Sequence, residues 1–145
     1  MNIRPWTCFA LGVLLAVGCS HIGALKIYNN SGDAVTVIGV VGVDKRHPNG
    51  THTNRTELLP GSSGFAAITA EFEVRGPKGV WRYQPQPDPT GFSWRPYVRY
   101  EGRFMFELFQ LEADGALYVL RTNEVPPVTA FSAQPPGFPL HPVGK

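Results

Sequence analysis

Two runs of β-forming residues flank an Asp-Gly pair late in the chain. The first run, residues 104–111, reads Phe-Met-Phe-Glu-Leu-Phe-Gln-Leu, and the second, residues 116–120, reads Ala-Leu-Tyr-Val-Leu. Because glycine accepts the positive φ of a tight turn, this pattern predicts a hairpin. Apolar residues occupy both faces of the first run except at Glu107 and Gln110, which is typical of a strand inside a sheet. We therefore expect the core to form around this hairpin.

Shorter β patterns occupy much of the remaining chain. The run over 34–43 is apolar on both faces and is expected near the middle of a sheet. Residues 65–75 alternate most regularly, with Phe72 and Val74 on one face and Glu71 and Glu73 on the other. A Gly-Pro-Lys-Gly turn follows them and predicts a second hairpin. The strands expected besides the late hairpin are 24–28, 34–43, 55–59, 65–75, 80–83 and 97–101.

Turn-forming residues separate these short strands, and no helical period of 3.6 residues stands out after the N-terminal segment. The chain has 145 residues, with 16 glycines and 14 prolines. One domain of this size with many turns favours an all-β fold. We expect a single antiparallel β-sandwich of about seven to eight strands over residues 25–125, Ig-like or transthyretin-like in architecture.

Two stretches look irregular because proline cannot donate a backbone hydrogen bond to a sheet. A long proline-rich loop is expected over 84–96, and a proline-rich extended tail over 126–145. The tail is expected either to lie over the domain or to remain free for a partner. A polar, basic loop is expected over 44–56.

The N-terminus has the three-part layout of an export signal. Arg4 supplies a positive start, residues 8–17 are apolar, and small residues follow. The apolar stretch is shorter than the roughly 20 residues that span a bilayer. We therefore expect residues 1–18 to be a signal peptide and 19–24 a short tether, with cleavage after Ala24 as the alternative.

The four residues Ala16-Val17-Gly18-Cys19 resemble the lipobox of bacterial lipoproteins. This resemblance implies that Cys19 becomes the first residue of the mature chain and receives lipid. Ser20, in place of aspartate, implies sorting to the outer membrane of a two-membrane bacterium, facing the periplasm or the cell surface. With the alternative cleavage, the product is a soluble secreted chain that begins at Leu25.

Composition excludes several classes of protein. The chain has two cysteines, at positions 8 and 19, so the mature domain has no internal disulfide and no zinc site built of cysteines. The formal net charge of +2 is too small for the electrostatic footprint of a general nucleic-acid binder. We expect no nucleic-acid partner and no cofactor, and the oligomeric state is left open.

Aromatic residues and arginines interleave from position 81 to 103. Aromatic rings stack on sugars or extended peptides, and arginine forms forked hydrogen bonds with carboxylates. The competing interpretation is that the rings fill the core while the arginine stems cover its edges. Phe92 and Trp94 are the best exceptions to that interpretation, because they lie in the proline-rich loop. The candidate binding surface comprises Phe92, Trp94, Arg95, Trp81 and Arg99.

No catalytic or metal-binding constellation is recognisable. Ser62 and Ser63 lie in a Pro-Gly-Ser-Ser-Gly turn rather than between a strand and a helix, where a nucleophile elbow would be. Glu71 and Glu73 are interpreted as solvated charges on a strand. His47 and His52, near Asp44, match no ligand spacing and are interpreted as part of a solvated loop. We therefore predict no catalytic residue and no metal site.

Glycosylation acceptor triplets begin at Asn29, Asn49 and Asn54. They favour the secreted alternative, since all three fall in expected turns or loops. The leading hypothesis remains a membrane-anchored lipoprotein that acts as a non-enzymatic binding or assembly module in the bacterial envelope. Its expected partners are the membrane, through the lipid, and a protein or cell-wall glycan. The alternatives are a secreted, glycosylated β-sandwich that binds or inhibits an external protein or glycan, and a small envelope hydrolase.

Overall fold

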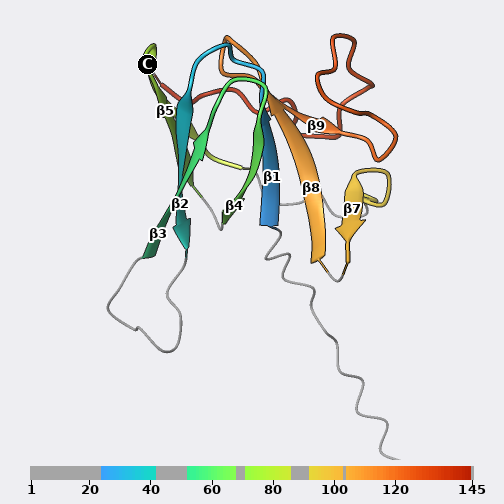
Figure 1. Cartoon of the computed structure of the whole chain (residues 1–145). Helices are drawn as coiled ribbons and strands as arrows, with labels where there is room; N and C mark the ends of the chain where they lie inside the picture. Colours follow the sequence, from blue (N-terminus) through green and yellow to red (C-terminus); the bar gives the residue numbers. More distant parts are fainter. Residues whose placement is uncertain (1–23, 42–51, 68–70, 86–91, 103, 145) are drawn as a thin grey trace, which may run out of the picture.

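The computed structural model describes residues 24–41, 52–67, 71–85, 92–102 and 104–144. This part of the chain is all-β, with two sheets and no helix (Figure 1). No helix in the described residues is long and apolar enough to cross a membrane. The strands are β1 Ala24–Asn29, β2 Val35–Val41, β3 His52–Leu58, β4 Ser63–Ala67, β5 Phe72–Gly76, β6 Gly79–Tyr83, β7 Val98–Glu101, β8 Phe104–Leu111 and β9 Leu117–Leu120.

The first sheet forms around β8, as the hydrophobic pattern predicted. Its order is β4-β1-β8-β7, and β9 also pairs with β8. Along one edge of β8, β7 pairs with the first half of the strand and β9 with the second half. The β8–β9 hairpin is confirmed: its turn is closed by a 3.0 Å hydrogen bond from the Gly115 N–H to the Glu112 carbonyl. Gly115 has a φ of 87°, which only glycine adopts readily.

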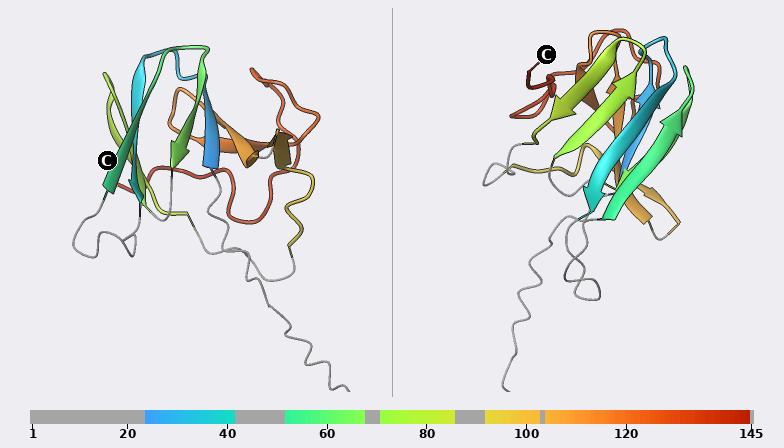
Figure 2. Two further views of the ribbon diagram at one scale, coloured as in Figure 1. Left: turned by 60° about the horizontal axis from the view of Figure 1, so that its bottom comes forward. Right: turned by 90° about the vertical axis from the view of Figure 1, so that its left-hand side faces the viewer.

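The second sheet has the order β3-β2-β5-β6, and the right panel of Figure 2 looks onto it. The interior position expected for the apolar strand that begins at residue 34 is confirmed, because β2 lies between β3 and β5. The predicted second hairpin is confirmed as β5–β6, with Gly76 opposite Gly79.

Three expectations about strands were wrong. β1 runs parallel to β8, so the stack is not purely antiparallel. Alternating apolar residues carry no information about strand direction, and the long connection from β1 to β8 leaves room for a crossover. The strand expected over 65–75 is two strands, β4 and β5, in different sheets. Ala66 on β4 and Phe72 on β5 both face the core. Apolar and polar residues therefore alternate in the same way before and after the chain passes from one sheet to the other.

The third correction concerns residues 52–54, which were expected only in a loop and form the first part of β3, ahead of the strand expected from residue 55. The polar residues Thr53 and Asn54 are exposed on an edge strand. Natural edge strands carry many polar and charged side chains, so composition alone suggested a loop. The nine strands of the described part therefore exceed the seven to eight that were expected.

The core lies between the two sheets. Leu111 and Val119 from the first sheet meet Val37, Val74 and Tyr83 from the second, and all five are 0–1% exposed. The Tyr83 ring stacks on Phe72 at 4.7 Å between centroids, and its hydroxyl donates a 2.6 Å hydrogen bond to the Gly115 carbonyl. Burial raises the pKa of the Tyr83 hydroxyl far above its usual range. This contact ties the β8–β9 turn to the facing sheet.

The segment after Pro126 packs on the domain rather than extending from it. Leu117 and Leu140 exchange two backbone hydrogen bonds of 2.9 Å, and the Val143 N–H donates to the Arg82 carbonyl at 2.8 Å. The segment thus joins the edge of β9 to the edge of β6 and closes this side of the stack. Of the two expectations for the tail, the structure has the one in which it lies over the domain.

Two glutamine side chains also fix the C-terminal segment to the first sheet. Each pairs with a backbone N–H and carbonyl in the way that a peptide group would. The Gln110 amide donates to the Val128 carbonyl and accepts from the Val128 N–H, both at 2.8 Å. The Gln134 amide pairs likewise with the backbone of Val119, at 2.9 and 3.1 Å. Val128 and Phe131 thereby cover the outer face of the first sheet. Gln110, one of two polar exceptions in its strand, is fully buried for this reason.

Candidate functional site

Three of the five predicted surface residues lie together. Phe92, Trp94 and Arg95 line a hollow of about 570 Å³ beside β7, which we call the β7 hollow. Its remaining lining residues are Val98, Tyr100 and Met105. The alternation of the strand expected over 97–101 was the available signal for Val98 and Tyr100, because residues two apart point to the same face.

A turn places the proline-rich loop against β7. The N–H groups of Tyr97 and Val98 both donate to the Trp94 carbonyl, at 2.8 and 3.1 Å. β7 begins at once with Val98, and Tyr100 stands opposite Met105 in the β7–β8 register. The loop thus supplies one wall of the hollow and the β7–β8 hairpin the other.

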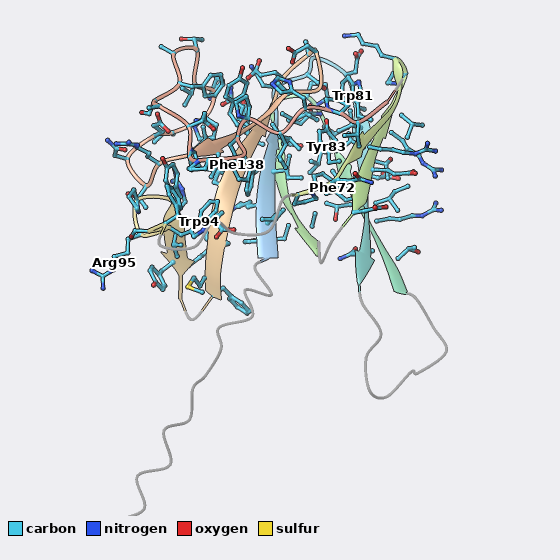
Figure 3. All side chains as sticks on the ribbon, turned by 180° about the vertical axis from the view of Figure 1, so that it is seen from behind. Phe72, Trp81, Tyr83, Trp94, Arg95 and Phe138 are labelled. Carbon is cyan, nitrogen blue, oxygen red and sulfur yellow. The ribbon has the colours of Figure 1, made fainter. Side chains whose placement is uncertain are left out.

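Trp94 forms part of the core as well as of the hollow. Its ring meets three aromatic rings edge to face: Phe92 at 5.2 Å, Tyr97 at 6.0 Å and Phe138 at 5.8 Å between centroids. The Trp94 ring points inward, whereas Arg95 points away from the domain (Figure 3). The Trp94 Nε1–H is buried and has no hydrogen-bond partner in the described part of the chain. Neighbouring rings therefore occupy the surroundings of Trp94, and Arg95 is the freer of the two.

Arg99 lies on the opposite face of β7 and has a structural role. Its guanidinium donates to the carbonyls of Arg121 and Glu124. Desolvation by burial lowers the pKa of Arg99, although the nearby Glu124 carboxylate opposes this effect. These two hydrogen bonds join the segment after β9 to the start of β7, whereas the Arg99 Nε–H is buried and has no hydrogen-bond partner in the described part of the chain.

Trp81 belongs to the other sheet. It lies on β6 and packs against the Gly115 turn, where a Cβ on Gly115 would come within 3.0 Å of the indole ring. Figure 3 shows Trp81 well away from Trp94 and Arg95. The five predicted residues therefore lie in three places. Phe92, Trp94 and Arg95 line the β7 hollow, Arg99 lies on the other face of β7, and Trp81 packs between β6 and the Gly115 turn.

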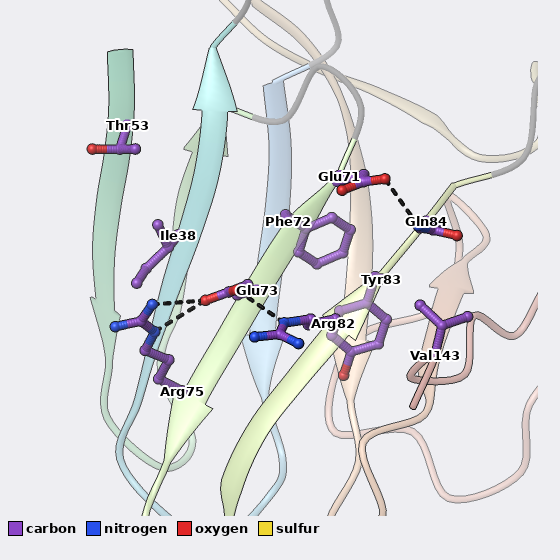
Figure 4. A pocket seen from close by; sticks show the side chains of 10 residues that line it. All are labelled: Ile38, Thr53, Glu71, Phe72, Glu73, Arg75, Arg82, Tyr83, Gln84 and Val143. Carbon is purple, nitrogen blue, oxygen red and sulfur yellow. Dashed lines mark hydrogen bonds and ion pairs between the residues drawn. The ribbon is translucent and has the colours of Figure 1, made fainter. Parts of the chain in front are cut away.

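A second hollow, of about 560 Å³, lies on the outer face of the second sheet (Figure 4). Its charged groups pair with one another. Glu73 accepts from Arg75 at 2.8 Å and from Arg82 at 3.1 Å, and the hydrogen bonds from these guanidinium groups lower the pKa of Glu73. Glu71 accepts from Gln84 at 2.9 Å. The carboxylates of this hollow are thus held by guanidinium and amide groups of the same surface.

The expected acceptor triplets differ in accessibility. Asn29 is fully buried; its amide donates to the carbonyls of Asp33 and Leu58, and its oxygen accepts from Ser31. The folded domain therefore offers no free amide at Asn29. Asn54 is exposed on β3, whereas Asn49 lies outside the described residues.

Several predicted features lie in parts of the chain that the structure does not describe. They include Cys19, the signal peptide, Asp44 and His47. Within the described ranges, no group of three or more His, Cys, Asp or Glu side chains is arranged to hold a metal ion.

Comparisons with known proteins give no relative for this chain. No family model matches it, and searches of curated proteins and of solved structures found no significant match.

Proposed function

We propose that this chain is an exported lipoprotein, attached to the membrane by lipid on Cys19, whose domain binds an envelope protein. The partner adds an extended strand along β7 and places side chains in the β7 hollow. Export and lipidation rest on the leader and on the lipobox-like residues that end at Cys19. We retain an Ig-like or transthyretin-like architecture in this proposal, since both are two-sheet stacks used widely for binding.

The single observation behind the binding site is a sheet edge that lies beside an aromatic hollow. Within the described residues, β7 pairs on one side only, with β8. An unpaired edge accepts backbone hydrogen bonds from an added strand, and an adjacent pocket selects its side chains. By contrast, β9 and β6 have their outer edges occupied by the C-terminal segment. Among the strand edges on this side of the described domain, the outer edge of β7 is thus the uncovered one, to which a partner strand can add.

A protein fits this site better than a cell-wall glycan. Three rings surround Trp94, which leaves Tyr100 as the largely exposed ring of the hollow. The unpaired backbone of β7 beside that ring suits a peptide strand rather than a sugar. Arg95 is exposed at the rim and suits a carboxylate on the partner. The proposed role is non-enzymatic, and the hydrogen bond from the Ser132 hydroxyl to the Glu124 carboxylate serves to hold the C-terminal segment.

Site-specific photocrosslinking in the native host tests this proposal. A photoreactive residue at Val98 should give one discrete adduct, and Tyr100→Ala should reduce its yield about tenfold, since loss of roughly 1.4 kcal/mol of binding free energy weakens affinity tenfold. The control position is Thr53, exposed on β3 at an edge of the other sheet. A protease-sensitive adduct supports the proposal. Equal labelling at both positions, or an adduct with glycan, would refute it.

A further inference from the structure

The described domain carries exposed apolar side chains at the end where the chain enters β1. Tyr100 is 74% exposed, Phe104 72% and Met105 43%. We call these three residues the entry-end patch. They lie at the tip of the β7–β8 hairpin, where Tyr100 stands opposite Met105 on one face and Phe104 lies on the other, so both faces of the tip carry exposed apolar side chains.

The strand register fixes where this patch lies. Ala24, the first residue of β1, stands opposite Phe106 on the parallel strand β8. Phe104 comes two residues earlier, so the β7–β8 turn extends about 7 Å beyond Ala24 at a rise of about 3.3 Å per residue. Figure 1 shows this turn and the start of β1 at the same end of the domain. The turn therefore points in the direction from which β1 is entered.

A lipid on Cys19 would place a bilayer close to this end. Ala24 is the fifth residue after Cys19, and five extended residues reach at most about 18 Å. A fully extended tether would place Cys19 about 18 Å beyond Ala24, and the β7–β8 turn already extends about 7 Å beyond Ala24 the same way. Measured along β1, the turn then lies within about 11 Å of the lipid attachment point. A tether this short keeps the entry end of the domain next to the membrane.

The chemistry of the patch suits a lipid interface. Aromatic side chains favour the boundary between headgroups and acyl chains. Among the described residues near the patch, Lys26 pairs with Glu101 at 3.5 Å, whereas the exposed Arg95 lines the hollow that Tyr100 and Met105 share. Apolar contact of the exposed side chains would thus act together with attraction of Arg95 to anionic headgroups.

We infer that the entry-end patch rests on the bilayer surface and sets the orientation of the domain. This inference rests on the proposed lipid anchor at Cys19. The β7 hollow shares Tyr100 and Met105 with the patch and so lies directly above the membrane. A partner bound along β7 would then meet the domain at the membrane surface.

The test uses the chain from Cys19 onward, coupled chemically through the Cys19 thiol to a maleimide headgroup in phosphatidylethanolamine and phosphatidylglycerol vesicles. Chemical coupling supplies the anchor whether or not a host attaches lipid to Cys19. This experiment therefore tests the orientation of the domain, and the intact mass of the native chain tests lipidation. Depth is measured as quenching of an added tryptophan by lipids brominated in their acyl chains. Phe104→Trp probes the patch.

Leu59→Trp is the matched control, because Leu59 is 67% exposed. It lies in the turn whose Gly61 N–H donates to the Asn29 carbonyl, at the opposite end of β1. Above the common background of Trp81 and Trp94, the signal added by Phe104→Trp should fall roughly twofold in brominated vesicles, as for an interfacial ring. The signal added by Leu59→Trp should stay unchanged. Equal quenching at both positions, or none at Phe104→Trp, would overturn the inference.

Discussion

Replacement of Gln110 by alanine should destabilise the domain through its C-terminal segment. Gln110 lies in the middle of the first sheet, is fully buried, and pairs with both the N–H and the carbonyl of Val128 at 2.8 Å. Its amide also donates to Glu112. Gln110→Ala removes these hydrogen bonds and leaves the Val128 backbone groups without their partner.

The magnitude follows from the number of groups left unpaired. A buried polar group that loses its partner costs about 1–3 kcal/mol, and Val128 is only half-buried, which favours the lower part of that range. Two such groups give a loss of about 3 kcal/mol in the free energy of unfolding. The matched control is Gln84→Ala, because Gln84 is exposed and, in the described part of the chain, donates to the exposed Glu71. Its effect should stay within about 0.5 kcal/mol.

Denaturant unfolding measures the loss, and limited chymotrypsin digestion locates it. The Phe131 ring stacks on Tyr118 with centroids 3.8 Å apart, so a secured segment protects the bond after Phe131. Cleavage there should accelerate in Gln110→Ala and not in Gln84→Ala. A change in stability below about 0.5 kcal/mol for Gln110→Ala would refute the role given to this amide.

Three further predictions concern single side chains. Trp94→Ala should cost about 3 kcal/mol in denaturant unfolding, because three rings pack against the indole; a loss under 1 kcal/mol would show that Trp94 is not part of the core. Asn29→Ala should cost roughly 3 kcal/mol by loss of its buried hydrogen bonds, and mass spectrometry of the folded protein should find no glycan at Asn29. Burial alone would raise the pKa of the Glu124 carboxyl, but hydrogen bonds from Ser132 and the Arg121 N–H outweigh it and lower the pKa below the ordinary 4.5. Stability from Glu124 is thus present above pH 4.5 and lost as the pH falls through the lowered value, so Glu124→Gln should flatten the acid limb of the thermal stability profile; an unchanged limb would contradict this.

The sequence indicated the centre of each sheet because a strand that is buried on both faces is apolar at nearly every position. The apolar runs of β8 and β2 predicted interior strands, and Asp-Gly predicted the turn between β8 and β9. The parallel direction of β1 and the passage of the chain from one sheet to the other between β4 and β5 produce no such pattern in the sequence. An apolar residue faces the core in the same way whichever neighbour its strand pairs with.

The candidate site was predictable only in part. The loop position of Phe92, Trp94 and Arg95 indicated a shared surface, and these residues do line one hollow. Trp81 and Arg99 have the same residue types, but their contacts depend on the Gly115 turn and on the carbonyls of residues 121 and 124. Such long-range partners cannot be read from local spacing. Gln110 and Gln134 illustrate the same limit, since each pairs with backbone 15 or more residues away.

Both proposals have the domain acting at a membrane, held by lipid on Cys19. The most direct test is the intact mass of the mature chain purified from the organism that produces it. A chain that begins at Cys19 and carries diacylglycerol is the predicted result. An unmodified chain that begins at Leu25 would contradict the account.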